Sequence, residues 1–294
     1  MHPVLDDLIT LLQLERIEDN IFRGESRDIG SAQVFGGQVL GQALSAAQHT
    51  VDGRVAHSLH AYFLRRGDMQ APIVYEVDRA RDGGSFSNRR VVAIQHGRPI
   101  LNLAASFQNP EQGVQHQARM PDVPGPDDCR DIFETEWDQL QKMPEVMRRH
   151  MADKRAFEIR PAPQDGRDHM PRKNVWLRTV DKLPAGLALH QNLLAYASDY
   201  ELLGVSTLPH DLPFGTGSVI MASLDHALWF HRPMQIDEWL LYSMDSPNAS
   251  GARGYARGQF FSRDGELIAS TAQEGLVRVV TGVAGKRSDP KLQD

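Results

Sequence analysis

The sequence contains very little cysteine and no long apolar run. Cys129 is its only cysteine, so an intrachain disulfide is impossible and nothing points to an oxidising compartment. No apolar run approaches the roughly 18 residues of a membrane span, and the first residues lack the basic segment and apolar core of a signal peptide. These absences predict a cytoplasmic protein without a membrane partner.

Basic residues are fewer than acidic ones. The 294 residues include 32 Lys and Arg against 38 Asp and Glu, which gives a formal net charge of −6. This balance argues against nucleic acid as a partner, because a protein that binds phosphates needs a basic surface. A hydrophobic content of 41% is typical of globular proteins, and the length fits one large domain or two of ordinary size.

Several catalytic motifs are missing as well. The sequence has no Gly-x-Ser-x-Gly elbow, which excludes the serine nucleophile of α/β-hydrolases. The glycine cluster at 215–218 lacks the spacing of a phosphate-binding loop and is interpreted as a loop before a strand. His226 and His231 are five residues apart, on opposite faces of a strand, so they do not predict a zinc site. Cys129 has no activating neighbours and is not predicted to be a nucleophile.

A weak internal repeat is the most informative feature that the sequence does contain. The segment Leu224–Pro233 has a weaker counterpart at Leu59–Gly67, and Tyr75–Asp78 falls on Tyr242–Asp245 at the same shift of 167 residues (242 − 75). A chain that repeats itself once, with polar residues placed differently in the two copies, indicates a duplicated fold in which one copy carries the chemistry.

Apolar periodicity predicts a helix followed by antiparallel strands in each half, an α+β architecture. One helix face carries Gly37, Gly41 and Ser45, and we expect it to lie very close to a sheet that curls around it. Residues 109–172 are rich in proline and are interpreted as the connection between the halves. The predicted helices are 5–18, 35–47, 137–155 and 187–203, and the predicted strands are 57–64, 73–77, 90–94, 100–107, 157–160, 218–230, 238–244, 254–261 and 267–277.

Three polar residues stand out in apolar surroundings of the second half. Asp199 follows an apolar helix face, where burial would raise the pKa of its carboxyl and make it a better base, although a solvated helix aspartate is the other interpretation. Ser223 shares a strand face with Asp225, in a place where serines are commonly structural. Gln273 lies inside a strand, where an amide needs hydrogen-bond partners.

Together with other segments, these residues resemble one family along nearly the whole chain. The resemblance is to acyl-CoA thioesterase II, the bacterial and peroxisomal type with a double hotdog fold. The segments that carry it are 33–39, 82–87, 196–199, 224–233 and 270–275.

The resemblance implies two tandem hotdog repeats, each a long helix wrapped by a curved antiparallel sheet. It implies a catalytic triad of Asp199, Ser223 and Gln273, acting on acyl-CoA without metal or cofactor, in a homodimer or homotetramer. We expect Asp199 to activate a water, Ser223 and Gln273 to hold it, and Gln273 also to polarise the thioester oxygen together with a backbone N–H. Some members carry threonine where this chain has Ser223.

The resemblance also predicts the organisation of the chain. We expect an N-terminal hotdog at 1–115, a connection with a helix at 116–155, a C-terminal hotdog at 156–285 and a flexible tail at 286–294. At a shift of 154 Ser45 falls on Asp199, and at a shift of 165 Gln108 falls on Gln273, which predicts one active site per chain. His57 matches a histidine considered for catalysis in the family, and we expect a structural role for it.

Two other functions stay open from the sequence alone. A hotdog acyl-thioester hydratase or dehydratase usually carries an aspartate–histidine pair on the loop that leads into the helix, whereas Asp225-His226 is predicted on a strand. A non-catalytic acyl-CoA-binding module would not need all three polar residues of the triad. An assay of thiol release from acyl-CoA separates these functions from a thioesterase.

Overall fold

The computed structural model gives the architecture of most of the chain. It describes residues 1–27, 33–135, 155–163, 170–210 and 219–280, together with residues 141, 145, 148 and 212. The glycine cluster at 215–218, the tail at 286–294 and most of the helix predicted at 137–155 lie outside the described residues.

The first half begins with helix α1 (Pro3–Leu12) and a hairpin, β1 (Glu15–Glu18) and β2 (Ile21–Gly24). Helix α2 (Gly36–Gln48) follows. The half ends with four strands, β3 (Val55–Phe63), β4 (Ile73–Asp82), β5 (Phe86–Gln95) and β6 (Arg98–Gln108).

The second half repeats this order. After the short helices η1 (Pro126–Asp128) and α3 (Ile132–Thr135), the hairpin of β7 (Phe157–Ala162) and β8 (Arg172–Thr179) leads to helix α6 (Leu187–Ala197). A 3-10 helix, η2 (Leu203–His210), precedes the last strands. These are β9 (Val219–Ser223), β10 (Asp225–Phe230), β11 (Leu240–Ser250), β12 (Arg253–Ser262) and β13 (Leu267–Val279).

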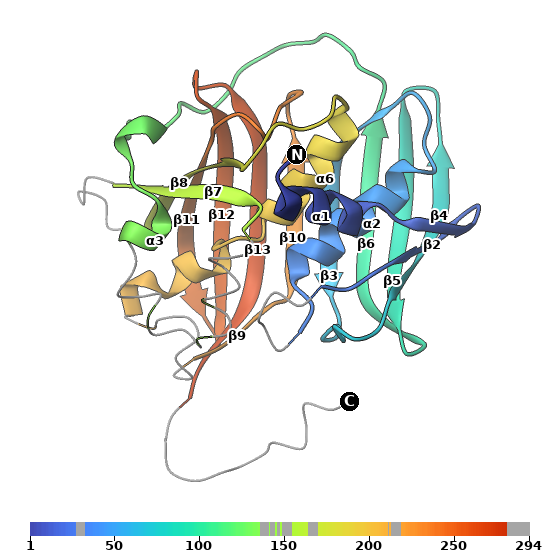
Figure 1. Ribbon diagram of the computed structural model, residues 1–294, viewed down its shortest axis with the longest axis horizontal. Helices are drawn as coiled ribbons and strands as arrows, with labels where there is room; N and C mark the ends of the chain where they lie inside the picture. The colour runs from blue at the N-terminus through green and yellow to red at the C-terminus, as the bar shows by residue number, and fades with distance from the viewer. Residues whose placement is uncertain are drawn as a thin grey trace.

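All of these strands form one antiparallel sheet in which the two halves meet at β3 and β10. The order is β1-β2-β4-β5-β6-β3-β10-β13-β12-β11-β8-β7, and β9 lies off this path and pairs with β13. Each half therefore contributes the same arrangement of six strands, and Figure 1 shows β3 and β10 together near its middle. His60 pairs with Ala227 across this junction, and these positions differ by 167, the shift of the sequence repeat. A local two-fold axis therefore relates the copies, and the predicted α+β fold is confirmed.

The repeat also extends to individual hydrogen bonds. Arg65 Nη1 donates to the carbonyl oxygen of Pro99 at 2.7 Å, and Arg232 Nη1 donates to that of Leu267 at 2.7 Å. The two arginines are 167 residues apart (232 − 65). Arg65 joins the end of β3 to β6, and Arg232 joins the end of β10 to β13, the adjacent strand of the sheet in each half. This shared contact explains why the repeat is visible as a motif in the sequence.

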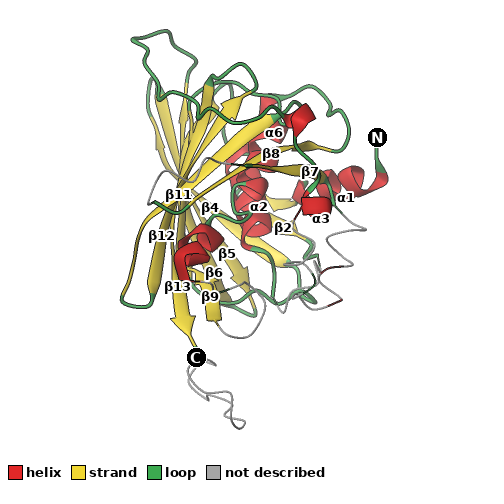
Figure 2. Ribbon diagram, turned by 90° about the vertical axis from the view of Figure 1, so that its left-hand side faces the viewer, coloured by secondary structure: helices red, strands yellow, loops and turns green. Residues whose placement is uncertain are grey.

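The helices cover one face of the sheet, as Figure 2 shows for α1, α2 and α6. Glycines of α2 face helix α6: a Cβ added to Gly37 would lie 2.2 Å from the backbone oxygen of Tyr196, and one added to Gly41 would lie 3.0 Å from that of Asn192. The expectation that this small face meets the sheet was wrong. Because glycine has no side chain, α2 and α6 can approach each other closely. The face of α2 that carries the larger side chains packs against the sheet.

Two predicted helices end early. Helix α1 stops at Leu12 rather than residue 18, because the chain turns into β1. Helix α6 stops at Ala197 rather than residue 203: Ser198 is its C-cap and Glu201 has a left-handed φ of 61°. Leu202 is fully buried, so the apolar pattern continues across this turn and gives the impression of a longer helix.

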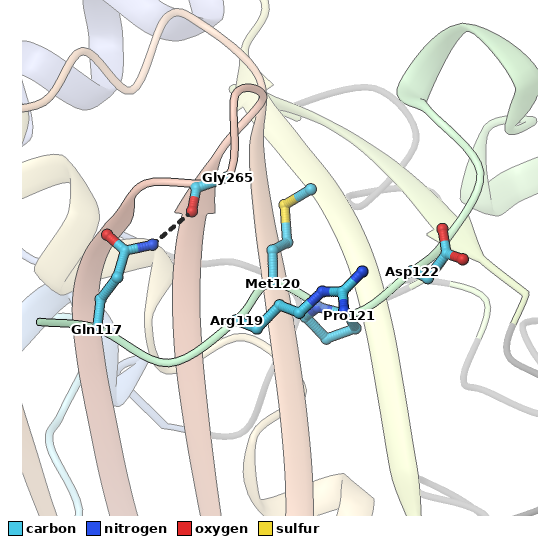
Figure 3. Close-up of a pocket in the computed structure, with 6 residues that line it drawn as sticks. All are labelled: Gln117, Arg119, Met120, Pro121, Asp122 and Gly265. Carbon is cyan, nitrogen blue, oxygen red and sulfur yellow. Dashed lines mark hydrogen bonds between the residues drawn. The ribbon is translucent and has the colours of Figure 1, made fainter.

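The opposite face of the second half is covered by the connecting segment. Trp176, Trp239, Leu241 and Phe261 form a second apolar cluster there, against which Met120 packs. Gln117 fastens this segment to the sheet, because its amide donates to the Gly265 carbonyl at 2.7 Å and accepts from the Leu267 N–H at 3.2 Å. Figure 3 shows the segment crossing the strands beside a pocket that Gly265 helps to line. The predicted domain boundaries stay a prediction.

The glycine contact between α2 and α6 generates a stability prediction. Gly37→Ala places a Cβ against fixed backbone, so we expect a loss of about 1–3 kcal/mol in the free energy of unfolding, measured with urea. Gly204→Ala is the matched control, because nothing lies within 4 Å of a Cβ there, and should change stability by less than about 0.5 kcal/mol. Equal effects of the two substitutions would contradict the close approach.

Candidate active site

Asp199 lies between the two halves of the chain, directly after the C-cap of α6. Its carboxylate reaches the first turn of α2, where it accepts a hydrogen bond from the backbone N–H of Gly37. A Cβ on Gly36 would lie 2.7 Å from Asp199 Oδ2, so only glycine leaves room for the carboxylate. The positive end of the α2 dipole favours a negative charge at this place.

Burial changes the acidity of this carboxyl. Desolvation raises the pKa of Asp199 from 3.8 to about 6, while the hydrogen bonds from Gln273 and from the Gly37 N–H act in the opposite direction. Desolvation is the larger effect because aromatic rings crowd the site. Phe35 lies 5.0 Å from the ring of Tyr196 and is stacked on Tyr200 at 5.3 Å.

Gln273, on β13, joins Asp199 to Ser223. Its Nε2 donates to Asp199 Oδ1 at 2.9 Å and to Ser223 Oγ at 2.7 Å, and the residue is 1% exposed. The amide must face this way, because the reverse orientation would point its oxygen at a carboxylate. Both hydrogens of Nε2 are then used, which leaves none for a thioester oxygen. That Gln273 polarises the thioester oxygen stays a prediction.

Ser223 is directed toward Gln273 by a β-bulge. Ser223 pairs with Gly275 and Ala227 pairs with Ala272, so three residues on β9–β10 oppose two on β13. The predicted continuous strand 218–230 is thus interrupted at Leu224. Bulges often re-aim a side chain beside a site. Because the Ser223 oxygen accepts from Gln273, its own O–H points elsewhere and meets no acceptor among the described residues.

The corresponding place in the first half is filled. Gly37 falls on Gln191 at the shift of 154, and Gln191 is buried and donates to the backbone oxygen of Ala56 at 2.7 Å. Ala56 is the counterpart of Ser223 (223 − 167), and Ser45 takes the place of Asp199. The first copy therefore has no carboxylate where the second has Asp199, and no hydroxyl where the second has Ser223.

Two residues considered from the sequence lie outside this cluster. His57 accepts or donates a hydrogen bond with Ser106 Oγ at 2.8 Å in the first half, and burial lowers the pKa of its imidazole. Cys129 belongs to the connecting segment and is buried in the apolar cluster that this segment forms with the sheet, where desolvation raises the pKa of its thiol. Among the residues that the structure describes, no three His, Cys, Asp or Glu side chains converge as metal ligands do, and no helix is long and apolar enough to span a membrane.

Sequence reasoning found the three polar residues and missed their surroundings. Phe35, Tyr196 and Tyr200 form an aromatic wall beside the site. This wall and the glycine pair at the start of α2 lie in segments that were predicted only as helices or matched only as motifs. The spacing of Tyr196 and Tyr200, one helical turn, was a usable signal. Nothing in the sequence said that Phe35 would come from the other half to meet them.

Comparisons with known proteins agree with this architecture. The family model "Acyl-CoA thioesterase N-terminal domain" matches residues 23–108, and the model "Acyl-CoA thioesterase" matches residues 146–276. Acyl-CoA thioesterase 2 of Haemophilus influenzae is 44% identical over 283 residues, which are 95% of this chain and 99% of that protein.

Solved structures show the same fold. The crystal structure of an acyl-CoA thioesterase II from Mycobacterium marinum is 41% identical, has a TM-score of 0.80, and aligns over 94% of this chain and 99% of its own. A protein with a hot dog fold from Alicyclobacillus acidocaldarius is 20% identical, with a TM-score of 0.73 over 94% of this chain and 99% of its own. The fold is a double hotdog, and the protein is a thioester hydrolase. Within that class, the chain belongs to the acyl-CoA thioesterase II family.

The raised pKa of Asp199 makes a prediction about stability. Because the folded pKa of about 6 exceeds the ordinary value of 3.8, folding favours the protonated form. The stabilisation is complete below about pH 4 and is lost as pH rises through 6. We expect wild type to lose about 2–3 kcal/mol of unfolding free energy relative to Asp199→Asn between pH 4 and pH 8. Urea titrations at both values measure this difference, and a constant difference would show that Asp199 is solvated.

Proposed function

We propose that the chain hydrolyses acyl-CoA to a free acid and CoA with a water molecule that Asp199 activates. The observation that carries this proposal is the bridge through Gln273, whose Nε2 contacts both the Asp199 carboxylate and the Ser223 hydroxyl. Family membership supports acyl-CoA as the substrate. The resemblance supports a homodimer or homotetramer.

The chemistry fits these residue types. Asp199 accepts a proton from water as the water oxygen bonds to the thioester carbon, and the carbonyl electrons move to its oxygen. The intermediate collapses with cleavage of the C–S bond, and the thiolate takes the proton back from Asp199. Because a thioester carbonyl is electrophilic and a thiolate leaves readily, one positioned base suffices.

Ser223 and Gln273 have separate parts in this proposal. Gln273 fixes the carboxylate through its hydrogen bond to Asp199 Oδ1. The lone pairs that Gln273 and the Gly37 N–H do not use are left to face the water. Ser223 accepts from Gln273, so its O–H is left to donate to the water or to the carbonyl oxygen of the substrate. The start of α2, beside Gly36, supplies a positive electrostatic environment for the oxygen that becomes negative.

The hydratase alternative is disfavoured by the contacts of Asp225 and His226. The carboxylate of Asp225 accepts the N–H of Glu274 at 2.7 Å, and His226 is 1% exposed and bonded to Ser198. Neither side chain is free to act on a carbon of the acyl group. A binding module without activity would give no thiol release in the assay below.

Asp199→Asn should lower kcat for acyl-CoA by about 10²–10⁴-fold, because the base is lost while the shape is kept. The assay follows thiol release with a chromogenic reagent. His57→Asn is the matched control and should keep the wild-type rate, since His57 contacts Ser106 in the first half. An Asp199→Asn enzyme as fast as wild type would refute the proposed mechanism.

The rate should also depend on pH in a defined direction. Only the deprotonated carboxylate accepts a proton, so kcat should be level above about pH 7 and fall below the Asp199 pKa of about 6, by roughly tenfold per pH unit at low pH. Initial rates from pH 4.5 to 8, with the thermal midpoint measured at each pH, check this. A flat profile over the range in which the protein stays folded would contradict it.

A further inference from the structure

Asp225 and His226, which lie just after the β-bulge, each contact a residue next in sequence to a proposed catalytic residue. Asp225 and His226 follow Ser223 by two and three residues and project to opposite faces of β10. Asp225 bonds to the residue after Gln273, and His226 bonds to the residue before Asp199. The mechanism above uses neither of them.

The bond made by His226 can be assigned a direction. Ser198 Oγ lies 2.9 Å from His226 Nε2 and 2.9 Å from the carbonyl oxygen of Ala195. A carbonyl only accepts, so the Ser198 hydrogen goes to Ala195, and His226 Nε2 must carry a hydrogen and donate it. Burial lowers the pKa of His226 to about 3, so the ring is neutral and acts as a fixed donor.

The backbone carbonyl of Ser198 is also held by a hydrogen bond. Tyr242 OH donates to the carbonyl oxygen of Ser198 at 2.8 Å, and its own oxygen is 3.0 Å from Thr271 Oγ1, which must therefore donate. The Ser198–Asp199 peptide is thus anchored to β10 by the side chain of Ser198 and to β11 and β13 by its carbonyl. Because Asp199 directly follows a helix end, these anchors determine where its carboxylate lies.

Asp225 holds Gln273 and Ser223 together as His226 holds Asp199, from the opposite face of β10. Beside the bulge, the side chain of Asp225 takes the place of a backbone acceptor, because its Oδ1 accepts the N–H of Glu274 at 2.7 Å. The Glu274 carbonyl in turn accepts from the Leu224 N–H at 3.0 Å. These two bonds fix the segment that carries Gln273 against the segment that carries Ser223.

The first half shows that the fold itself does not need the polar contact that His226 makes with Ser198. A bulge occurs at the same place, since Ala56 pairs with Phe107 and Ser58 with Ser106. At the repeat shifts, however, His226 corresponds to Leu59 (226 − 167) and Ser198 to Leu44 (198 − 154). Both leucines are fully buried in the apolar core. The copy without a carboxylate thus has an apolar pair where the copy with Asp199 has a polar one.

We propose that Asp225 and His226 are positioning residues, which hold Gln273 with Ser223 and Asp199 respectively in the geometry for hydrolysis. The inference rests on the proposed function, because it assigns these residues a purpose only if the three side chains act on a substrate. Both residues belong to the segment Leu224–Pro233, whose repetition marks the duplicated fold.

The test compares two substitutions at each position. His226→Leu removes the donor to Ser198, whereas His226→Gln keeps an N–H donor; Asp225→Ala removes the acceptor for Glu274, whereas Asp225→Asn keeps one. We expect His226→Leu and Asp225→Ala to lower kcat for acyl-CoA by about 10–100-fold, as misplacement of catalytic groups does. KM should change by less than about 2-fold, and the Gln and Asn variants should recover most of the rate.

The pH profile gives a second readout. Hydrogen bonds from Gln273 and Gly37 lower the pKa of Asp199, so loss of its alignment in His226→Leu should move the acid limb of the rate to higher pH. Tyr196, Tyr200 and Tyr242 also face Asp199, and burial raises the pKa of each phenol. These phenols therefore do not titrate in the range of the acid limb.

Each outcome has a clear meaning. A purely structural role would lower the thermal midpoint but leave kcat per folded enzyme and the acid limb unchanged, and that result overturns the inference. Equal rates for the two variants at each position overturn it as well. Should His226→Leu fail to fold, the double variant Ser198→Ala/His226→Leu replaces it, because it removes both hydrogen-bond partners and resembles the apolar pair of the first half. The Asp225 variants test the inference independently, because Asp225 is partly exposed.

The proposed function is tested separately in the same series. If Asp199→Asn keeps the wild-type rate, the proposed function fails whatever the other variants do. If Asp199→Asn is inactive while His226→Leu and Asp225→Ala hydrolyse acyl-CoA at the wild-type rate with an unchanged acid limb, only the positioning role fails.

Discussion

The close approach of helices α2 and α6 is the constraint on which the site depends. Glycine at 36 and 37 lets the end of one helix meet the start of the other, so that the Asp199 carboxylate lies where a side chain would otherwise be. The same contact joins the halves on the helical side, as the pairing of β3 with β10 does in the sheet. Cofolding of both copies is thus required to form one site.

Duplication supplied two equivalent places, and their differences explain why one of them has the cluster. Glycine in one copy corresponds to Gln191 in the other, whose side chain fills the space and bonds to backbone. An aspartate corresponds to Ser45, and a polar contact at His226 corresponds to buried leucines. The shared bulge and the shared arginine bonds belong to the fold, whereas the residues that differ belong to the site.

Electrostatics at Asp199 is a balance of opposing effects. Aromatic rings and the sheet exclude water and raise the pKa of the carboxyl, while the Gln273 amide and the Gly37 N–H stabilise its charged form. Desolvation predominates, which places the carboxyl near the range where a general base is effective. The charged form costs folding energy at neutral pH, as expected where function and stability compete for the same side chain.

The sequence by itself determined the repeat, the α+β class, most strand positions and the three polar residues, because periodicity and motif are local properties. The prediction placed Asp199 on a helix that ends two residues earlier, because the apolar spacing continues across the turn. It also assigned the small face of α2 to the sheet, because a local pattern does not show which element a helix face will contact. Only the tertiary structure decided that Gly37 meets Asp199, that Gln273 uses both amide hydrogens, and that Asp225 bonds to Glu274 and His226 to Ser198. Each of these contacts joins residues far apart in the chain, and long-range pairing is set by packing rather than by local sequence.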